Sequence, residues 1–289
     1  MTQVAATGRP APSLLSRVVK TTTRDPILLC AVLFLLGVAV SVVFAEWIAP
    51  HNPLRTSLRH QAKLPSAQFW LGTDEQGRDI LSRIIFGLRI TLMTSLSGLV
   101  IGIGLGSIIG LVAAYFRRLD MLLMRIIDVI LSFPAILIGL GLAGVTGGGN
   151  AGIIIALAVA TVGPAARIAR SAALTVVQMD YIAGARMVGL SDTQILLRYV
   201  LLNCLASIIV YATLRFGQLI LLAASLSFLG LGVAPPAPEL GVMVSQGRAL
   251  LLTAPHVALM PCAVILLLVL SLNLVGDALR DALDPQMKA

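Results

Sequence analysis

The sequence predicts an all-α integral membrane protein with six transmembrane helices. Of its 289 residues, 58% are hydrophobic and 12% are charged, and the mean hydropathy is +0.97. Soluble domains carry about 25% charged residues, so this composition excludes an ordinary soluble domain. Six apolar runs are long enough to cross a hydrocarbon core, which takes ~20 residues. We place these spans at about 27–48, 90–116, 121–144, 151–169, 203–227 and 256–278.

The chain begins with a basic tail at 1–26, followed by the first span at 27–48. Its apolar stretch exceeds the usual core of a signal peptide, about 7–15 residues, so we expect an uncleaved helix. An external segment at 49–89 separates this helix from a five-helix core at 90–278, and a short tail at 279–289 ends the chain.

The second span carries glycine at every fourth position, at Gly102, Gly106 and Gly110. A helix face without side chains lets a second membrane helix approach closely, so we expect a packing face here.

Prolines lie inside three of the spans, namely Pro134, Pro164 and Pro261. Membrane helices tolerate proline when neighbouring helices satisfy the freed backbone groups, so we expect kinks at these points in a packed bundle.

A few ionisable residues lie within or at the ends of the spans. Asp128 has Arg125 three residues before it, and Asp277 has Arg280 three residues after it, so each acid has a potential partner on its own helix. Arg215 has no acidic residue on its helix. Because a charge at that depth usually faces the bundle interior or a water-filled path, Arg215 is a candidate for the translocation path.

The basic residues predict the orientation. With six spans, both tails, the turn at 117–120 and the loop at 170–202 share one side, and that side holds 13 of the 21 lysines and arginines. We therefore expect both termini in the cytoplasm. The net charge of +8 then reflects loops at a lipid surface. We expect no nucleic acid partner, because only 5% of residues are aromatic and could stack on bases.

Cysteine and histidine are too scattered to suggest a disulfide framework or a metal site. The three cysteines lie far apart in the sequence without a C-x-x-C pair, and the three histidines are solitary. We therefore expect no metal and no cofactor on this chain.

The inner loop at 170–202 is patterned as helix, sharp turn, helix. Helix-forming residues run to Val188, Gly189 can supply a left-handed cap, and Ser191 with Gln194 forms a capping-box pattern. The first helix offers small residues beside larger apolar ones. This surface suits a groove in another protein, and an amphipathic helix lying in lipid headgroups is the alternative.

This loop resembles the cytoplasmic loop of ATP-binding-cassette importer permeases, whose pattern is E-A-A, three residues, G, nine residues, I-x-L-P. Aligning the pattern on Gly189 places E-A-A on 183–185, the I on Tyr199 and L-P on 201–202; one alanine, the glycine and the leucine agree. The resemblance implies coupling to an ATPase through Tyr181, Ala183, Gly184, Ala185, Gly189 and Leu201.

Four further segments strengthen this resemblance. The stretch W-L-G-T-D-E-Q-G-R-D at 70–79, with its continuation to Leu92, is similar to the segment before the core in the second permease of dipeptide, oligopeptide and nickel importers. The segments at 124–134, 225–241 and 273–285 are also similar to motifs of that group. Together these segments cover the chain from about residue 26 to its end.

The resemblance implies the type I ABC importer permease fold in a bacterial inner membrane. Such a subunit pairs with a homologous sister permease, two cytoplasmic ATP-binding subunits and an external substrate-binding protein. It implies transport of di- or oligopeptides, while glutathione, nickel and metal chelates stay open as substrates. ATP and magnesium are then bound by the partner subunits.

The chain itself lacks a phosphate-binding motif. It has no G-x-x-x-x-G-K-[ST] sequence, and the glycines at 147–149 lack the following lysine, so we expect no enzyme activity. The alternative from another class is a stand-alone ion-coupled secondary transporter. Such proteins tend to carry several intramembrane acids and repeated halves, which this sequence does not display.

Overall fold

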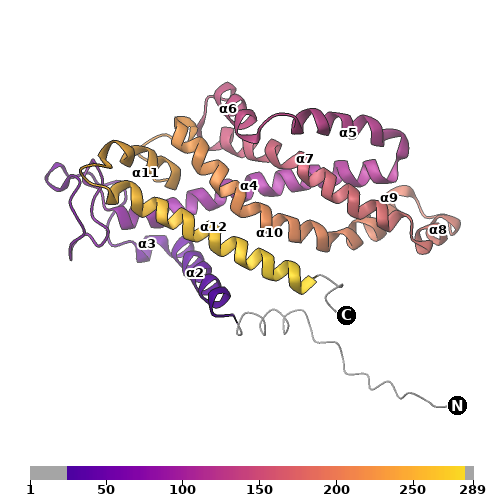
Figure 1. Cartoon of the computed structure of the whole chain (residues 1–289), viewed down its shortest axis with the longest axis horizontal. Helices are drawn as coiled ribbons and strands as arrows, with labels where there is room; N and C mark the ends of the chain where they lie inside the picture. The colour runs from indigo at the N-terminus through magenta and orange to yellow at the C-terminus, as the bar shows by residue number, and fades with distance from the viewer. Residues whose placement is uncertain (1–24, 284–289) are drawn as a thin grey trace, which may run out of the picture.

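The computed structural model describes residues 25–283, which form an elongated helical bundle (Figure 1). Within these residues, five helices are long and apolar enough to span a membrane: Pro26–Val43 (α2), Ile80–Tyr115 (α4), Gly149–Val177 (α7), Leu201–Leu226 (α10, within a longer run at 192–231) and His256–Leu283 (α12). A bent pair, Arg117–Leu131 (α5) and Ala135–Val145 (α6), makes a sixth span if it is counted as one. The predicted tails lie mostly outside the described residues.

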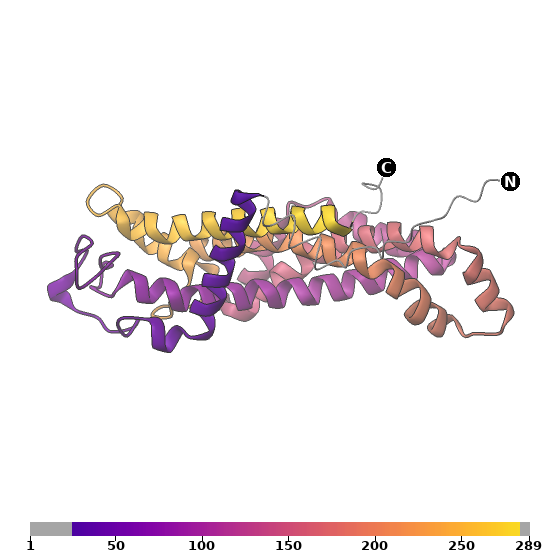
Figure 2. The same cartoon turned by 90° about the horizontal axis from the view of Figure 1, so that it is seen from below.

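Short helices complete the chain at the two ends of the bundle. The helices Ala45–Ile48 (α3) and Leu240–Gly247 (α11) lie at one end with the segment at 49–79, and Asp180–Met187 (α8) and Asp192–Ile195 (α9) lie at the other (Figures 1 and 2). The predicted outer and inner loops are thus at opposite ends. Most helices follow the long axis, but α2 crosses the bundle steeply and packs on α12 and α4 (Figure 2).

The third span is broken rather than merely kinked. Helices α5 and α6 meet at an angle of 87° across residues 132–134. Pro134 has no N–H to continue the α5 ladder, and Ser132 closes the helix by donating its N–H to the carbonyl of Asp128. In contrast, α7 and α12 continue through Pro164 and Pro261 without interruption.

Helix α4 begins at Ile80, inside the segment predicted to be external, rather than near residue 90. Asp79 caps it by accepting hydrogen bonds from the N–H and the hydroxyl of Ser82, at 2.9 and 2.6 Å. Arg83 then lies in the first turns of the helix, fully buried. The apolar pattern missed these turns because their polar side chains are satisfied by tertiary contacts.

The glycine face of α4 packs directly on α7, as the spacing predicts. A Cβ atom added at Gly102 would lie 2.6 Å from Thr161 Cβ, and one added at Gly106 would lie 2.6 Å from Ala165 Cβ. Such distances are far below ordinary carbon contacts of about 3.5–4.0 Å. Only glycine permits this approach of the two backbones.

Candidate functional site

The inner end carries the predicted helix-turn-helix, with one change in its first helix. That helix is interrupted at Gln178, so that α7 ends at Val177 and α8 begins at Asp180. Gly189 adopts the left-handed conformation at φ +85°. The capping box of Ser191 and Gln194 is present and opens α9, which continues through a π-helical turn into α10.

A polar cluster fastens this loop to the inner end of α4. The hydroxyl of Tyr115 donates a hydrogen bond of 2.6 Å to Asp192 Oδ1, and the guanidinium of Arg186 lies 5.0 Å from the centre of the Tyr115 ring. Ile182 and Ala185 are buried in the apolar cluster beneath. The loop is therefore held firmly on the bundle.

The predicted coupling residues divide between two faces of this loop. Tyr181, Ala183 and Gly189 are exposed and Gly184 is half-buried, whereas Ala185 faces the bundle and Leu201 is the half-buried first residue of α10. The tip adds Met187 and Val188, which are 84% and 82% exposed. Adjacent apolar side chains this exposed are typical of a protein contact surface.

Arg215 is held by polar groups of α10 and α7. Its Nη1 donates to Gln218 Oε1 at 2.5 Å, and its Nη2 donates to the carbonyl oxygen of Ala160 at 3.2 Å. Among the described residues it has no acidic partner. These bonds link two helices, and a role for Arg215 in the translocation path stays a prediction.

The outer end holds a buried ion cluster that composition and periodicity did not predict. Asp74 pairs with Arg78 at 2.6 Å and with Arg83 at 3.3 Å, and both arginines are at most 1% exposed. Each also donates from Nη2 to Gln246 Oε1 of α11 at 3.4 Å. The cluster thus ties the outer segment, α4 and α11 together. Three of its members belong to the stretch at 70–83, which the family resemblance singled out without giving it a role.

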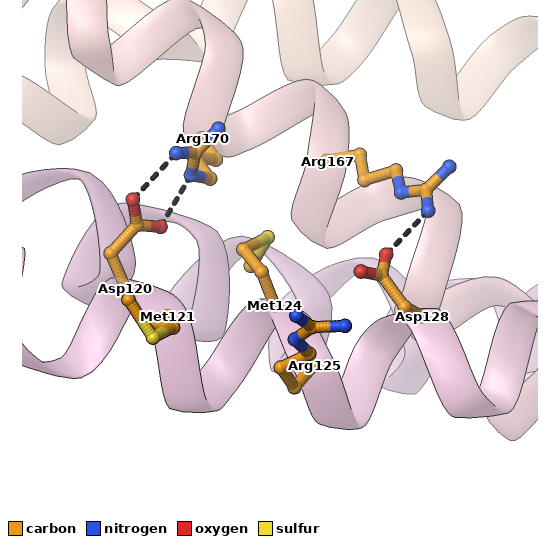
Figure 3. A pocket seen from close by; sticks show the side chains of 7 residues that line it. All are labelled: Asp120, Met121, Met124, Arg125, Asp128, Arg167 and Arg170. Carbon is orange, nitrogen blue, oxygen red and sulfur yellow. Dashed lines mark hydrogen bonds and ion pairs between the residues drawn. The ribbon is translucent and has the colours of Figure 1, made fainter.

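A charged cavity of about 500 Å³ lies between α5 and α7 (Figure 3). Two ion pairs cross it: Arg170 binds Asp120 through two hydrogen bonds of 2.6 Å, and Arg167 binds Asp128 at 2.6 Å. The predicted partnership of Asp128 with Arg125 is therefore wrong, because a helix opposite supplies a better-placed arginine. The second predicted pair, Asp277 with Arg280, is also not formed among the described residues.

Comparisons with known proteins agree with this architecture. The family described as "binding-protein-dependent transport system inner membrane component" matches residues 102–289. Glutathione transport system permease proteins GsiD of Escherichia coli O6:K15:H31 (strain 536 / UPEC) and Shigella boydii serotype 4 (strain Sb227) are each 43% identical over 267 residues, covering 92% of this chain and 88% of theirs.

Solved structures with a similar fold come from ABC transporters. An inward-facing structure of the MetNI methionine ABC transporter has a TM-score of 0.59 at 20% identity and covers 70% of this chain and 97% of its own. An amino acid ABC transporter crystallised with histidines has a TM-score of 0.52 at 16% identity and covers 68% and 92%. From its fold, its inner loop and these relatives, the chain belongs to the binding-protein-dependent transport system inner membrane components, and it is the permease of an ABC importer.

Proposed function

We propose that this permease pairs with a homologous sister permease, two cytoplasmic ATP-binding subunits and an external binding protein, and that its substrates are glutathione and small peptides. The α8–Gly189–α9 loop carries the proposal. Its exposed apolar tip suits a docking groove, and its buried side is fixed to α4 and α7. Movement of an attached ATPase would therefore reach the bundle.

Glutathione is the first substrate to test. Curated relatives that are 43% identical are glutathione permeases. Because glutathione is itself a tripeptide, it is compatible both with the peptide substrates that the sequence suggests first and with the glutathione alternative. A stand-alone ion-coupled transporter is less favoured, because the family is named for its dependence on a binding protein. In this arrangement both termini lie in the cytoplasm with the α8–α9 loop, and the partners supply ATP and magnesium.

The test is purification of the tagged chain from its native host, followed by reconstitution of the recovered complex in proteoliposomes. We expect the sister permease and ATPases to co-purify. Uptake of radiolabelled glutathione should require ATP, magnesium and the companion binding protein. A dipeptide and nickel are measured in parallel. Uptake without the ATPases would refute the proposal, and uptake of nickel alone would refute the substrate class.

Docking is tested with Gly189→Trp. A large side chain at this exposed, left-handed position should block both ATPase association and uptake. The matched control is Leu122→Trp, at a residue of α5 that is 60% exposed and outside this loop. Wild-type assembly and uptake of Gly189→Trp would contradict the docking role.

A further inference from the structure

The cavity between α5 and α7 has more positive than negative charge. It is lined by three arginines and two aspartates, together with Met121 and Met124. Both aspartates are paired with arginines of α7, and Arg125 remains (Figure 3). Its guanidinium forms no ion pair or hydrogen bond within residues 25–283. One cation of the cavity therefore has its full capacity to bind an anion.

The lining residues occupy a single face of α5. Positions 120, 121, 124, 125 and 128 follow helical spacing and point into the cavity. The opposite face carries Leu122, Ile126 and Val129, which are 52–62% exposed. An apolar face of this kind suits lipid, whereas charged side chains in a membrane helix face protein or water. The cavity is thus a charged groove, open at the surface of the chain, beside an apolar face that suits lipid.

The cavity lies on the inner side of the break in the third span. Arg167 and Arg170 lie in the second half of α7, nearer to the α8–α9 loop than to the outer end. The bend at 132–134 separates α5, which lines the cavity, from the apolar α6. The charged groove therefore lies in the half of the bundle that carries the α8–α9 loop.

The chemistry of the lining suits a carboxylate. A guanidinium presents two parallel N–H donors that match the two oxygens of a carboxylate. The methionines offer flexible apolar contacts that adapt to different side chains. Both aspartates are already neutralised by the arginines of α7, so the anion is drawn to Arg125. A peptide or glutathione carries at least one free carboxylate and can therefore pair with Arg125.

We propose that Arg125 forms a carboxylate-binding subsite on the inner part of the translocation path, where the transported substrate is held before release. The identity of the substrate rests on the proposed function, while the preference for a carboxylate rests on the cavity alone. The alternative occupants are an acidic side chain of the sister permease and a lipid phosphate.

The experiment is site-specific photocrosslinking in the assembled, nucleotide-free transporter in lipid nanodiscs. Met124 is replaced by p-benzoylphenylalanine, and tritiated glutathione or alanyl-alanine is added. Leu122 carries the same photoreactive residue as a control on the apolar face. We expect substrate labelling at Met124 and none at Leu122. Arg125→Gln should lower the labelling about tenfold or more, Arg125→Lys should retain part of it, and Arg118→Gln, on an exposed arginine outside the cavity, should leave it unchanged.

Three results would overturn the subsite: absence of substrate labelling at Met124, labelling that Arg125→Gln does not reduce, or crosslinks to the sister permease or phospholipid in place of substrate. ATP-driven uptake by the unmodified transporter is measured in parallel. Uptake without labelling refutes the subsite alone. Labelling without uptake refutes the proposed function alone, because binding in the nucleotide-free state does not require transport.

Discussion

Replacing Gly106 with alanine should separate helices α4 and α7. The added Cβ would lie 2.6 Å from Ala165 Cβ, 2.6 Å from the carbonyl oxygen of Val162 and 3.0 Å from the N–H nitrogen of Ala166. Two of these atoms belong to the backbone of α7, so no rotamer change relieves the clash. Because carbon atoms pack at about 3.5–4.0 Å, the helices must move apart by about 1 Å.

The matched control is Gly104→Ala on the same helix, where an added Cβ meets nothing within 4 Å. Both variants gain similar helix propensity, about 1 kcal/mol. Their difference therefore isolates the overpacking, which costs typically 1–3 kcal/mol. At about 2–4 °C per kcal/mol, Gly106→Ala should unfold about 2–12 °C below Gly104→Ala.

The cysteines provide the assay. Cys204 is buried, whereas Cys30 and Cys262 are exposed. In a background with both exposed cysteines changed to serine, a thiol-reactive dye reports unfolding through Cys204 alone, in purified protein in detergent. If Gly106→Ala unfolds at or above the temperature of Gly104→Ala, the glycine face does not set the spacing of α4 and α7.

Three further variants test the two ends of the bundle. Asp74→Asn removes the carboxylate between two buried arginines and should lower the free energy of unfolding by about 3–5 kcal/mol. The same dye assay measures the unfolding temperature. An unchanged temperature would contradict a stabilising role for the ion cluster. Gly189→Ala forces a side chain into a left-handed conformation, which costs about 1–2 kcal/mol of conformational energy, and it should reduce uptake. Its control is Gly184→Ala, which has free space at an ordinary helical position and should leave uptake unchanged. Equal uptake by both variants refutes this reasoning. Tyr115→Phe loses the hydrogen bond to Asp192, about 1 kcal/mol, and should lower substrate transported per ATP hydrolysed; an unaltered ratio argues against a coupling role for this contact.

Local signals in the sequence predicted local structure well. The capping box at Ser191 and Gln194, the left-handed Gly189 and the glycine face of α4 all depend on residues within a few positions of one another, and the structure contains each. At Pro134 a kink was expected, whereas the structure has a break between two helices that meet at 87°. These features follow from backbone geometry that neighbouring residues determine.

Features that depend on a second helix were missed. Asp128 was expected to pair with Arg125 on its own helix, but Arg167 of α7 reaches it. The start of α4 was placed too late because a charged residue such as Arg83 suggests a loop when its partner Asp74 is not known. The cavity between α5 and α7 likewise combines residues far apart in the chain. Hydropathy locates spans, but it does not show which polar faces meet.

Helix α4 links the outer and inner ends of the bundle mechanically. It is fastened at its outer end through Arg83 and at its inner end through Tyr115. At 1.5 Å per residue, these anchors are about 48 Å apart. A rod clamped in this way converts a small tilt into opposite displacements at its tips: about 10° around the midpoint moves each tip by about 4 Å. A rigid α4 would therefore couple displacements at the two ends of the bundle, and its close contact with α7 along its length opposes bending.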